Sequence, residues 1–116
     1  MTQHDDVAYL ARMLEMANTA QRITQGKTIE DLRNDEVLQL AVTNALSLIG
    51  EAARHVSPQV RTGTPNIPWN QVIGMRNRIV HNYFEINFDR VWDTISNDLN
   101  PLIDALRGIV PKGPPA

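Results

Sequence analysis

Four polar side chains lie within eight consecutive residues of the second half of the chain: Arg76, Asn77, His81 and Tyr83. A histidine can accept or donate a proton near neutral pH. An arginine can hold two phosphate oxygens and stabilise the charge that develops during phosphoryl transfer. An asparagine can orient the histidine or bind the substrate backbone. These residue types together indicate cleavage of a phosphodiester bond.

RNA fits these side chains because its 2′-hydroxyl is an internal nucleophile, so no metal-activated water is needed. The sequence has no clustered carboxylates or histidines and no cysteine to form a metal-ligand set. We therefore expect neither a metal nor another cofactor. Internal attack needs both a base and an acid, and one copy of the segment holds a single histidine. A two-fold homodimer would supply two His81 and two Arg76 side chains.

The helix that should carry these side chains is expected over residues 69–81. An unpaired guanidinium on an apolar face is costly, so the position of Arg76 needs an explanation. Either it pairs within the protein, with Glu51 or with helix-end carbonyls, or it points into a groove that another molecule completes. The presence of Asn77 and His81 beside it favours the groove. At about 100° per residue, the same face as Arg76 holds several apolar residues: Trp69, Val72, Ile73 and Val80.

Hydrophobic periodicity predicts the helices around this segment. Short connections between them predict an all-α fold, an antiparallel four-helix up-and-down bundle with a short extra helix. The length of 116 residues suits one compact domain, expected over residues 1–110, and residues 111–116 are expected to form a disordered tail. The four long helices are expected at 5–24, 34–57, 69–81 and 89–109.

Capping residues and prolines mark the expected boundaries. Thr28, with Asp31 three residues later, matches a capping box for the short helix, and Asn34 is expected to cap the second long helix. Residues 57–69 are expected to form a loop. Pro101 lies inside the last long helix and predicts a kink or a local widening there.

Composition excludes several classes of protein. The formal net charge of −2 argues against a broad basic surface for duplex nucleic acid, and the absence of cysteine excludes a disulfide framework. The first residues include two acids and no long apolar run, so a signal peptide is not expected. No stretch approaches the length of a membrane span. We expect a soluble, cytoplasmic protein with no membrane partner.

The segment MRNRIVHNYF resembles the signature of HepT-like proteins, a branch of the HEPN superfamily. The family pattern is an arginine, four residues, a histidine, one residue and a tyrosine. Arg76, His81 and Tyr83 match it without a gap, and Asn77 matches the usual Arg–Asn pair. Further segments also look like the family: ALSLIGEAARHVS, IPW and FDRVWDTISNDLNPLI.

This resemblance implies a helical dimer that is the toxin of a type VII-like toxin–antitoxin module. It implies RNA cleavage without metal through Arg76, Asn77 and His81. The implied partner is a minimal nucleotidyltransferase antitoxin, which silences the toxin by transferring AMP to Tyr83. A bulky anion beside Arg76 would block a phosphate site by charge and volume. Whether the dimer builds a larger hetero-oligomer with the antitoxin stays open.

Two other functions stay open. A phosphate-binding site can also hold a nucleotide, so the chain could be a non-catalytic nucleotide- or protein-binding subunit of a nucleotidyltransferase complex. It could instead be a structural dimerisation bundle in which Arg76 and His81 form a buried network. Glu51 is either a supporting residue that braces one of them or a plainly exposed carboxylate. Arg78 is expected on the outer, solvated face.

Overall fold

The computed structural model describes residues 3–81 and 85–111, and within these ranges the chain forms helices and short connections without strands. This confirms the predicted all-α class. Tyr83 and most of the predicted tail, residues 112–116, lie outside the described residues. None of the described helices is both long and apolar enough to span a bilayer. The elements are α1 (Gln3–Thr24), α2 (Ile29–Asn34), α3 (Glu36–Arg54), α4 (Pro58–Gly63), α5 (Trp69–His81), α6 (Phe88–Asp93), the π-helical segment η2 (Thr94–Asp98) and α7 (Leu99–Ile109).

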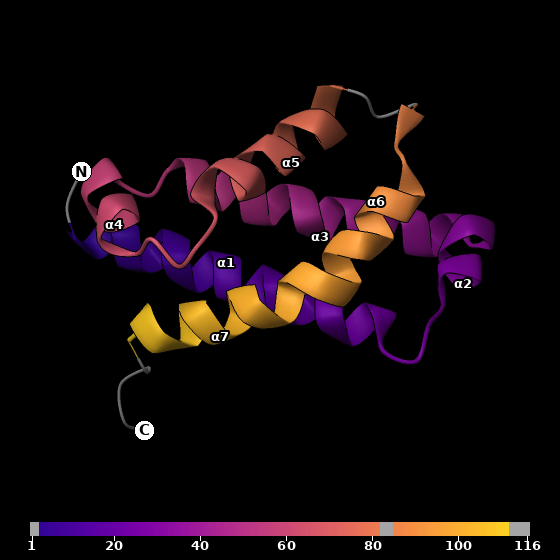
Figure 1. The fold of residues 1–116 in the computed structure, drawn as a ribbon, viewed down its shortest axis with the longest axis horizontal. Coiled ribbons are helices and arrows are strands. Elements are labelled where there is room, and N and C mark those ends of the chain that lie inside the picture. The colour runs from indigo at the N-terminus through magenta and orange to yellow at the C-terminus, as the bar shows by residue number, and fades with distance from the viewer. Residues whose placement is uncertain (1–2, 82–84, 112–116) are drawn as a thin grey trace.

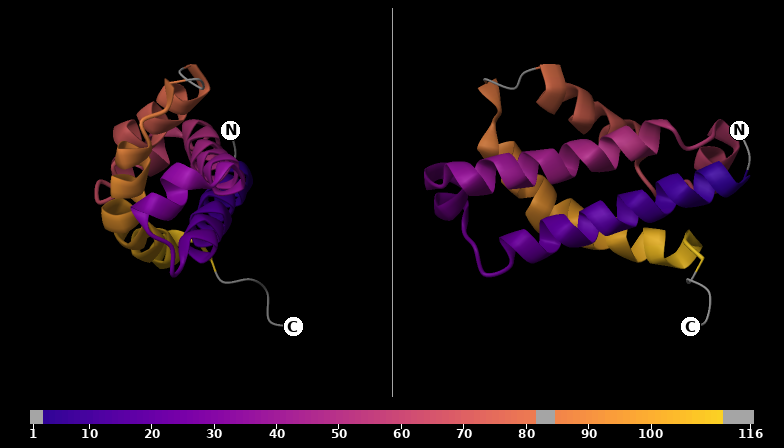
Figure 2. Two further views of the ribbon diagram at one scale, coloured as in Figure 1. Left: turned by 90° about the vertical axis from the view of Figure 1, so that its right-hand side faces the viewer. Right: turned by 180° about the vertical axis from the view of Figure 1, so that it is seen from behind.

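The long helices alternate in direction along the chain, as predicted for an up-and-down bundle (Figure 1). α3 packs against α1 and α5, while α7 packs on α1. Seen from behind, α1 and α3 lie side by side (Figure 2). The side of the bundle between α5 and the α6–η2 segment is less closely packed, and surface cavities lie there.

The core forms where α1, α3 and α7 meet, with contributions from α2 and α5. On α5 the predicted apolar face is partly wrong: Ile79 is buried, whereas Val80 is 45% exposed. The core-facing side of α5 is therefore shifted toward Val72 and Ile79, and Arg76 lies at its margin. The largest fully buried side chains are Met13, Leu32, Val42, Leu46, Ile49, Val56, Leu99 and Leu106.

Two predicted boundaries need correction, although the capping box at Thr28 is confirmed. The residue that caps α3 is Asp35, not Asn34, because the Asp35 carboxylate accepts a hydrogen bond from the Leu38 N–H at 3.1 Å. The predicted loop over 57–69 contains the short helix α4. Ser57 caps it and a proline occupies its first turn, which is a favourable start for a helix.

The widening predicted at Pro101 is confirmed and has a definite form. The chain passes through the π-helical segment η2 just before α7 begins at Leu99. Pro101 then lies in the first turn of α7, where its missing N–H matters least. The inserted π turn changes the direction in which α6 presents its side chains relative to α7.

Two long-range polar contacts that the sequence did not reveal hold the helix ends. Asp6 near the start of α1 is buried and accepts hydrogen bonds from the Ser57 N–H and the Ser57 hydroxyl, both at 2.8 Å. Arg33 at the end of α2 donates to Asp89 on α6 and to Glu30. The hydrogen bond with Asp89 is the main cause that raises the pKa of the Arg33 guanidinium.

Candidate functional site

Arg76 reaches its position because α3 and α5 approach closely at a glycine. A Cβ atom placed on Gly50 would lie 2.2 Å from the Cβ of Arg76 and 2.9 Å from the carbonyl oxygen of Val72. No side chain larger than hydrogen fits there, so the stem of Arg76 lies directly over the backbone of α3. This contact directs the guanidinium along α3 toward Glu51, the next residue of that helix.

The guanidinium of Arg76 lies between two polar side chains. Its Nε is 3.0 Å from Glu51 Oε2, and its Nη1 donates a 2.9 Å hydrogen bond to the Asn77 amide oxygen. The Glu51 contact has the distance of an ion pair but not the alignment of a hydrogen bond. Oε2 is buried and has no hydrogen-bond partner among the described residues. Charge, rather than a directed bond, therefore holds the two groups together.

Glu51 is a shared partner for three side chains, from α5 and from the C-terminal end of α3. Its other oxygen, Oε1, lies 3.3 Å from Nε2 of His55, the C-cap residue of α3, and 3.9 Å from Nε of Arg54. The His55 ring stacks on Tyr9 of α1, with centroids 4.9 Å apart and planes inclined by 18°. Glu51 therefore contacts Arg76 while its side chain stays partly exposed, and a supporting role for it remains a prediction.

His81 is the last residue of α5 and its side chain is exposed. It makes no hydrogen bond or ion pair with Arg76, Asn77 or Glu51. Five residues of an α-helix turn by about 500°, so His81 projects about 140° away from Arg76 around the axis. One protomer therefore does not bring the two side chains together. Tyr83 follows two residues later, outside the described residues.

The arrangement leaves Arg76 able to bind an anion. Its side chain is 21% exposed, and of the five N–H donors of a guanidinium only one makes a hydrogen bond to a described residue, Asn77. The Glu51 carboxylate balances the positive charge of the guanidinium. The parts of the chain that the structure describes hold no group of three or more histidine, aspartate and glutamate side chains that could bind a metal ion.

Sequence comparison identifies the family. The family model described as "Ribonuclease HepT-like" matches residues 13–109, which include Glu51 and every residue of the Arg76–Tyr83 segment. The chain belongs to this family. The similarity is therefore not limited to the short motif. It extends from the middle of α1 to the end of α7.

HepT-like relatives share about a third of their residues with this chain over most of their length. A Methanocaldococcus jannaschii protein, named as an inferred RNase, is 33% identical over 85% of this chain and 91% of its own. A Caldanaerobacter subterraneus protein of the same description is 30% identical over 90% and 93%. A Thermococcus cleftensis protein, named as an inferred ribonuclease HepT, is 31% identical over 81% and 86%. No solved structure matches the chain significantly.

Proposed function

We propose that this HepT-like protein is a metal-independent endoribonuclease, the toxin of a type VII-like toxin–antitoxin module, which acts on RNA in the cytoplasm. The observation that carries the proposal is that α5 holds both a partly exposed Arg76, positioned by Gly50, Glu51 and Asn77, and an exposed His81. The names of the relatives, which include RNases and a ribonuclease HepT, point to the same class of substrate.

The proposed reaction uses the RNA's own nucleophile. One His81 takes the proton of the 2′-hydroxyl, whose oxygen attacks the adjacent phosphorus. The new O–P bond forms as the bond to the 5′-oxygen breaks, and the His81 of a second protomer gives that oxygen a proton. Arg76 stabilises the additional negative charge on the non-bridging oxygens. The products are a 2′,3′-cyclic phosphate and a 5′-hydroxyl, and no atom must come from water or a metal.

A homodimer is needed because the two side chains diverge within one protomer. The outer face of α3 offers a surface for it: Val37 is 76% exposed and Leu40 is 47% exposed. Steps of three and four residues place these residues on one stripe that continues through Leu48 to Glu51. Exposed apolar stripes of this kind commonly mark interfaces. A two-fold contact along it would cover the stripe and bring the Arg76 side chains of both protomers to the same seam.

Control by an antitoxin is the second part of the proposal. We assign Tyr83 as the residue to which a minimal nucleotidyltransferase antitoxin transfers AMP. The tyrosine oxygen attacks the α-phosphorus of ATP and releases pyrophosphate, and the tyrosine proton passes to solvent. Tyr83 is two residues beyond His81, so the added phosphate would repel an RNA phosphate that approaches the same helix end.

The Glu51–Arg76 contact also favours a structural bundle, in which this ion pair only supports packing. The His81→Ala variant separates the two functions. If the protein is a nuclease, the variant should fold as wild type does. It should cleave RNA in the presence of a chelator at least about a hundred-fold more slowly, because general acid–base catalysis is lost. Asn70→Ala is the matched control, since this exposed residue lies three turns earlier on the same face of α5. Equal cleavage by wild type and His81→Ala would reject the nuclease.

A further inference from the structure

Two neighbouring cavities occupy the loosely packed side of the bundle, between α5 and the α6–η2 segment. The first has a volume of about 230 Å³ and is lined by Ile79, by Ile86 of the linker and by Val91 of α6. The second, of about 360 Å³, continues along α5 toward Leu46 of α3 and Leu102 of α7. The two cavities share several lining residues and form one groove, and neither Gly50 nor Arg76 lines it.

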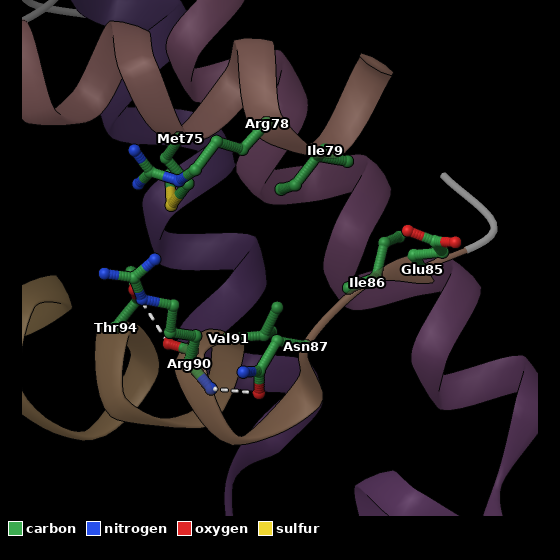
Figure 3. A pocket seen from close by; sticks show the side chains of 9 residues that line it. All are labelled: Met75, Arg78, Ile79, Glu85, Ile86, Asn87, Arg90, Val91 and Thr94. Carbon is green, nitrogen blue, oxygen red and sulfur yellow. Dashed lines mark hydrogen bonds between the residues drawn. The ribbon is translucent and has the colours of Figure 1, made fainter. Parts of the chain in front are cut away.

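Two arginines face each other across this groove. Arg78 reaches in from α5 and Arg90 from α6, and both guanidinium groups lie at the same end of the first cavity (Figure 3). Both side chains also line the second cavity, so they stand where the two cavities join. The residues that line both cavities are Met75, Arg78, Arg90 and Thr94.

These two guanidinium groups differ from those of Arg33 and Arg76, which have carboxylate partners. Neither Arg78 nor Arg90 forms a side-chain hydrogen bond or an ion pair with another described residue. The acidic residues of the groove line one cavity each rather than the junction: Glu85 the first, Asp93 and Asp98 the second. The junction is therefore a place where two cations converge without a carboxylate among the shared lining residues.

The backbone of η2 and α6 supports this geometry. The Asn87 side chain caps α6 by accepting a hydrogen bond from the Arg90 N–H at 3.2 Å, and the Thr94 hydroxyl donates to the Arg90 carbonyl oxygen at 3.2 Å (Figure 3). Both ends of the Arg90 backbone unit are thus held. The π turn begins at Thr94 itself, and such turns frequently occur at functional sites.

We propose that this groove is a substrate subsite, which holds one nucleotide of the RNA strand beside the bond that is cut. The phosphate binds between Arg78 and Arg90, and the base lies on the apolar wall formed by Met75, Ile79 and Ile86. Paired guanidinium groups are suited to a phosphate, and an apolar wall is suited to a base. The proposal rests on the endoribonuclease proposed above, since it names part of that enzyme's RNA-binding surface.

The position of the groove relative to the catalytic histidine fits one continuous strand. Arg78 precedes His81 by three residues, so the two side chains are neighbours on the surface of α5, about 4.5 Å apart along its axis. A strand whose phosphate rests on Arg78 can therefore present the next phosphate at His81. Arg76 does not line this groove.

The test measures RNA binding without cleavage. In a His81→Ala background, fluorescence anisotropy with a single-stranded RNA oligonucleotide gives the Kd of Arg78→Ala, Arg90→Ala and the double variant. We expect each single change to weaken binding about ten-fold, and to reduce the slope of log Kd against log salt by about 0.7 because one phosphate contact is lost. The double variant should lose little more, because both arginines hold one phosphate. Arg107→Ala, exposed on α7, is the matched control for loss of one charge.

Three outcomes overturn the subsite. Arg107→Ala weakens binding as much as Arg78→Ala, or the two groove variants bind RNA as the background does. In the third, adenosine monophosphate binds in a manner that depends on Arg78 and Arg90 while the RNA does not, which assigns the groove to a free nucleotide. Cleavage by the otherwise wild-type chain is followed in parallel. If wild type cleaves RNA but RNA binding does not depend on Arg78 or Arg90, the subsite alone is rejected. If wild type does not cleave RNA, the proposed nuclease activity is rejected.

Discussion

At residue 76 an arginine stands at the margin of a helix face that packs on the core. Three neighbours stabilise the arginine at this position. Gly50 leaves room for the aliphatic part of its side chain, Glu51 balances its charge, and Asn77 accepts a hydrogen bond from it. A half-exposed ion pair of this kind adds little to stability. Its main effect is to reduce the rotational freedom of the guanidinium, which would suit the proposed binding of a phosphate in one orientation.

Replacing Arg76 by lysine tests this orientation. Lysine keeps the charge but has no planar fork that can bind two oxygens at once. We expect Arg76→Lys to keep the wild-type melting temperature within about 3 °C and to lower kcat for RNA cleavage about ten-fold or more. Arg54→Lys is the control, because Arg54 contacts the same carboxylate from an exposed position. Equal loss in both variants would mean that Glu51, not Arg76, is the sensitive group.

The candidate site residues could be predicted from the sequence more fully than the packing that positions them. Arg76 and Asn77 could be named because an arginine on an apolar stripe is conspicuous, and Glu51 was one of the possible partners proposed for it. The role of Gly50 could not be predicted, because a glycine within a helix does not indicate which neighbouring helix will approach it. Arg78 was correctly expected to be exposed, but its partner across the groove, Arg90, belongs to another helix. Only the packing of α5 and α6 places them together.

At the scale of elements, the α3–α5 contact decides where the candidate site lies. Gly50→Ala would place a methyl group 2.2 Å from the Arg76 Cβ, so α5 must move away from α3. We expect a loss of about 1–3 kcal/mol in the free energy of unfolding, with a fall in cleavage as Arg76 is displaced. Chemical denaturation and RNA cleavage measure the two effects.

Gly108→Ala is the control for that substitution. Gly108 also lies in a helix, but a Cβ atom there would meet nothing within 4 Å. The alanine should stabilise the protein by about 0.5–1 kcal/mol through helix propensity and leave cleavage unchanged. If Gly50→Ala behaves in the same way, the close approach of α3 and α5 does not exist in solution.

The helices themselves were predictable where periodicity or capping chemistry is local. The bounds of α1 and α5, the capping box at Thr28 and the distortion before Pro101 follow from short-range rules. The helix α4 was missed because its six residues carry no apolar period, although Ser57 and the following proline form a start signal. The rotation of α5 that exposes Val80 depends on tertiary packing, which periodicity within one helix does not report.

At the scale of the whole molecule, the proposed activity depends on a second copy of the chain. None of the exposed apolar residues of the α3 stripe lines the groove, so a dimer along the stripe would leave the groove open to RNA. Each protomer would then contribute Arg76 at the dimer interface and an open groove beside His81. This separation allows dimer formation and RNA binding to be tested independently.

Substituting the stripe tests the dimer. Leu40→Asp places a charge on an exposed position of α3, so it should not disturb the fold of the protomer but should prevent a dimer that buries this residue. We expect a molecular mass of one chain by light scattering and a loss of cleavage of at least about a hundred-fold. Val7→Asp, on an exposed position of α1, should leave both unchanged. A fully active Leu40→Asp monomer would refute the composite site.

The central claim is that histidine and arginine alone direct attack by the RNA's own 2′-hydroxyl, and the ends of the product test it most directly. RNA is cut by the purified protein with a chelator present, and the new termini are identified by mass spectrometry. The account predicts 2′,3′-cyclic phosphate and 5′-hydroxyl ends, absent with His81→Ala. Fragments that end in a 3′-hydroxyl and a 5′-phosphate, or cleavage abolished by the chelator, would contradict it.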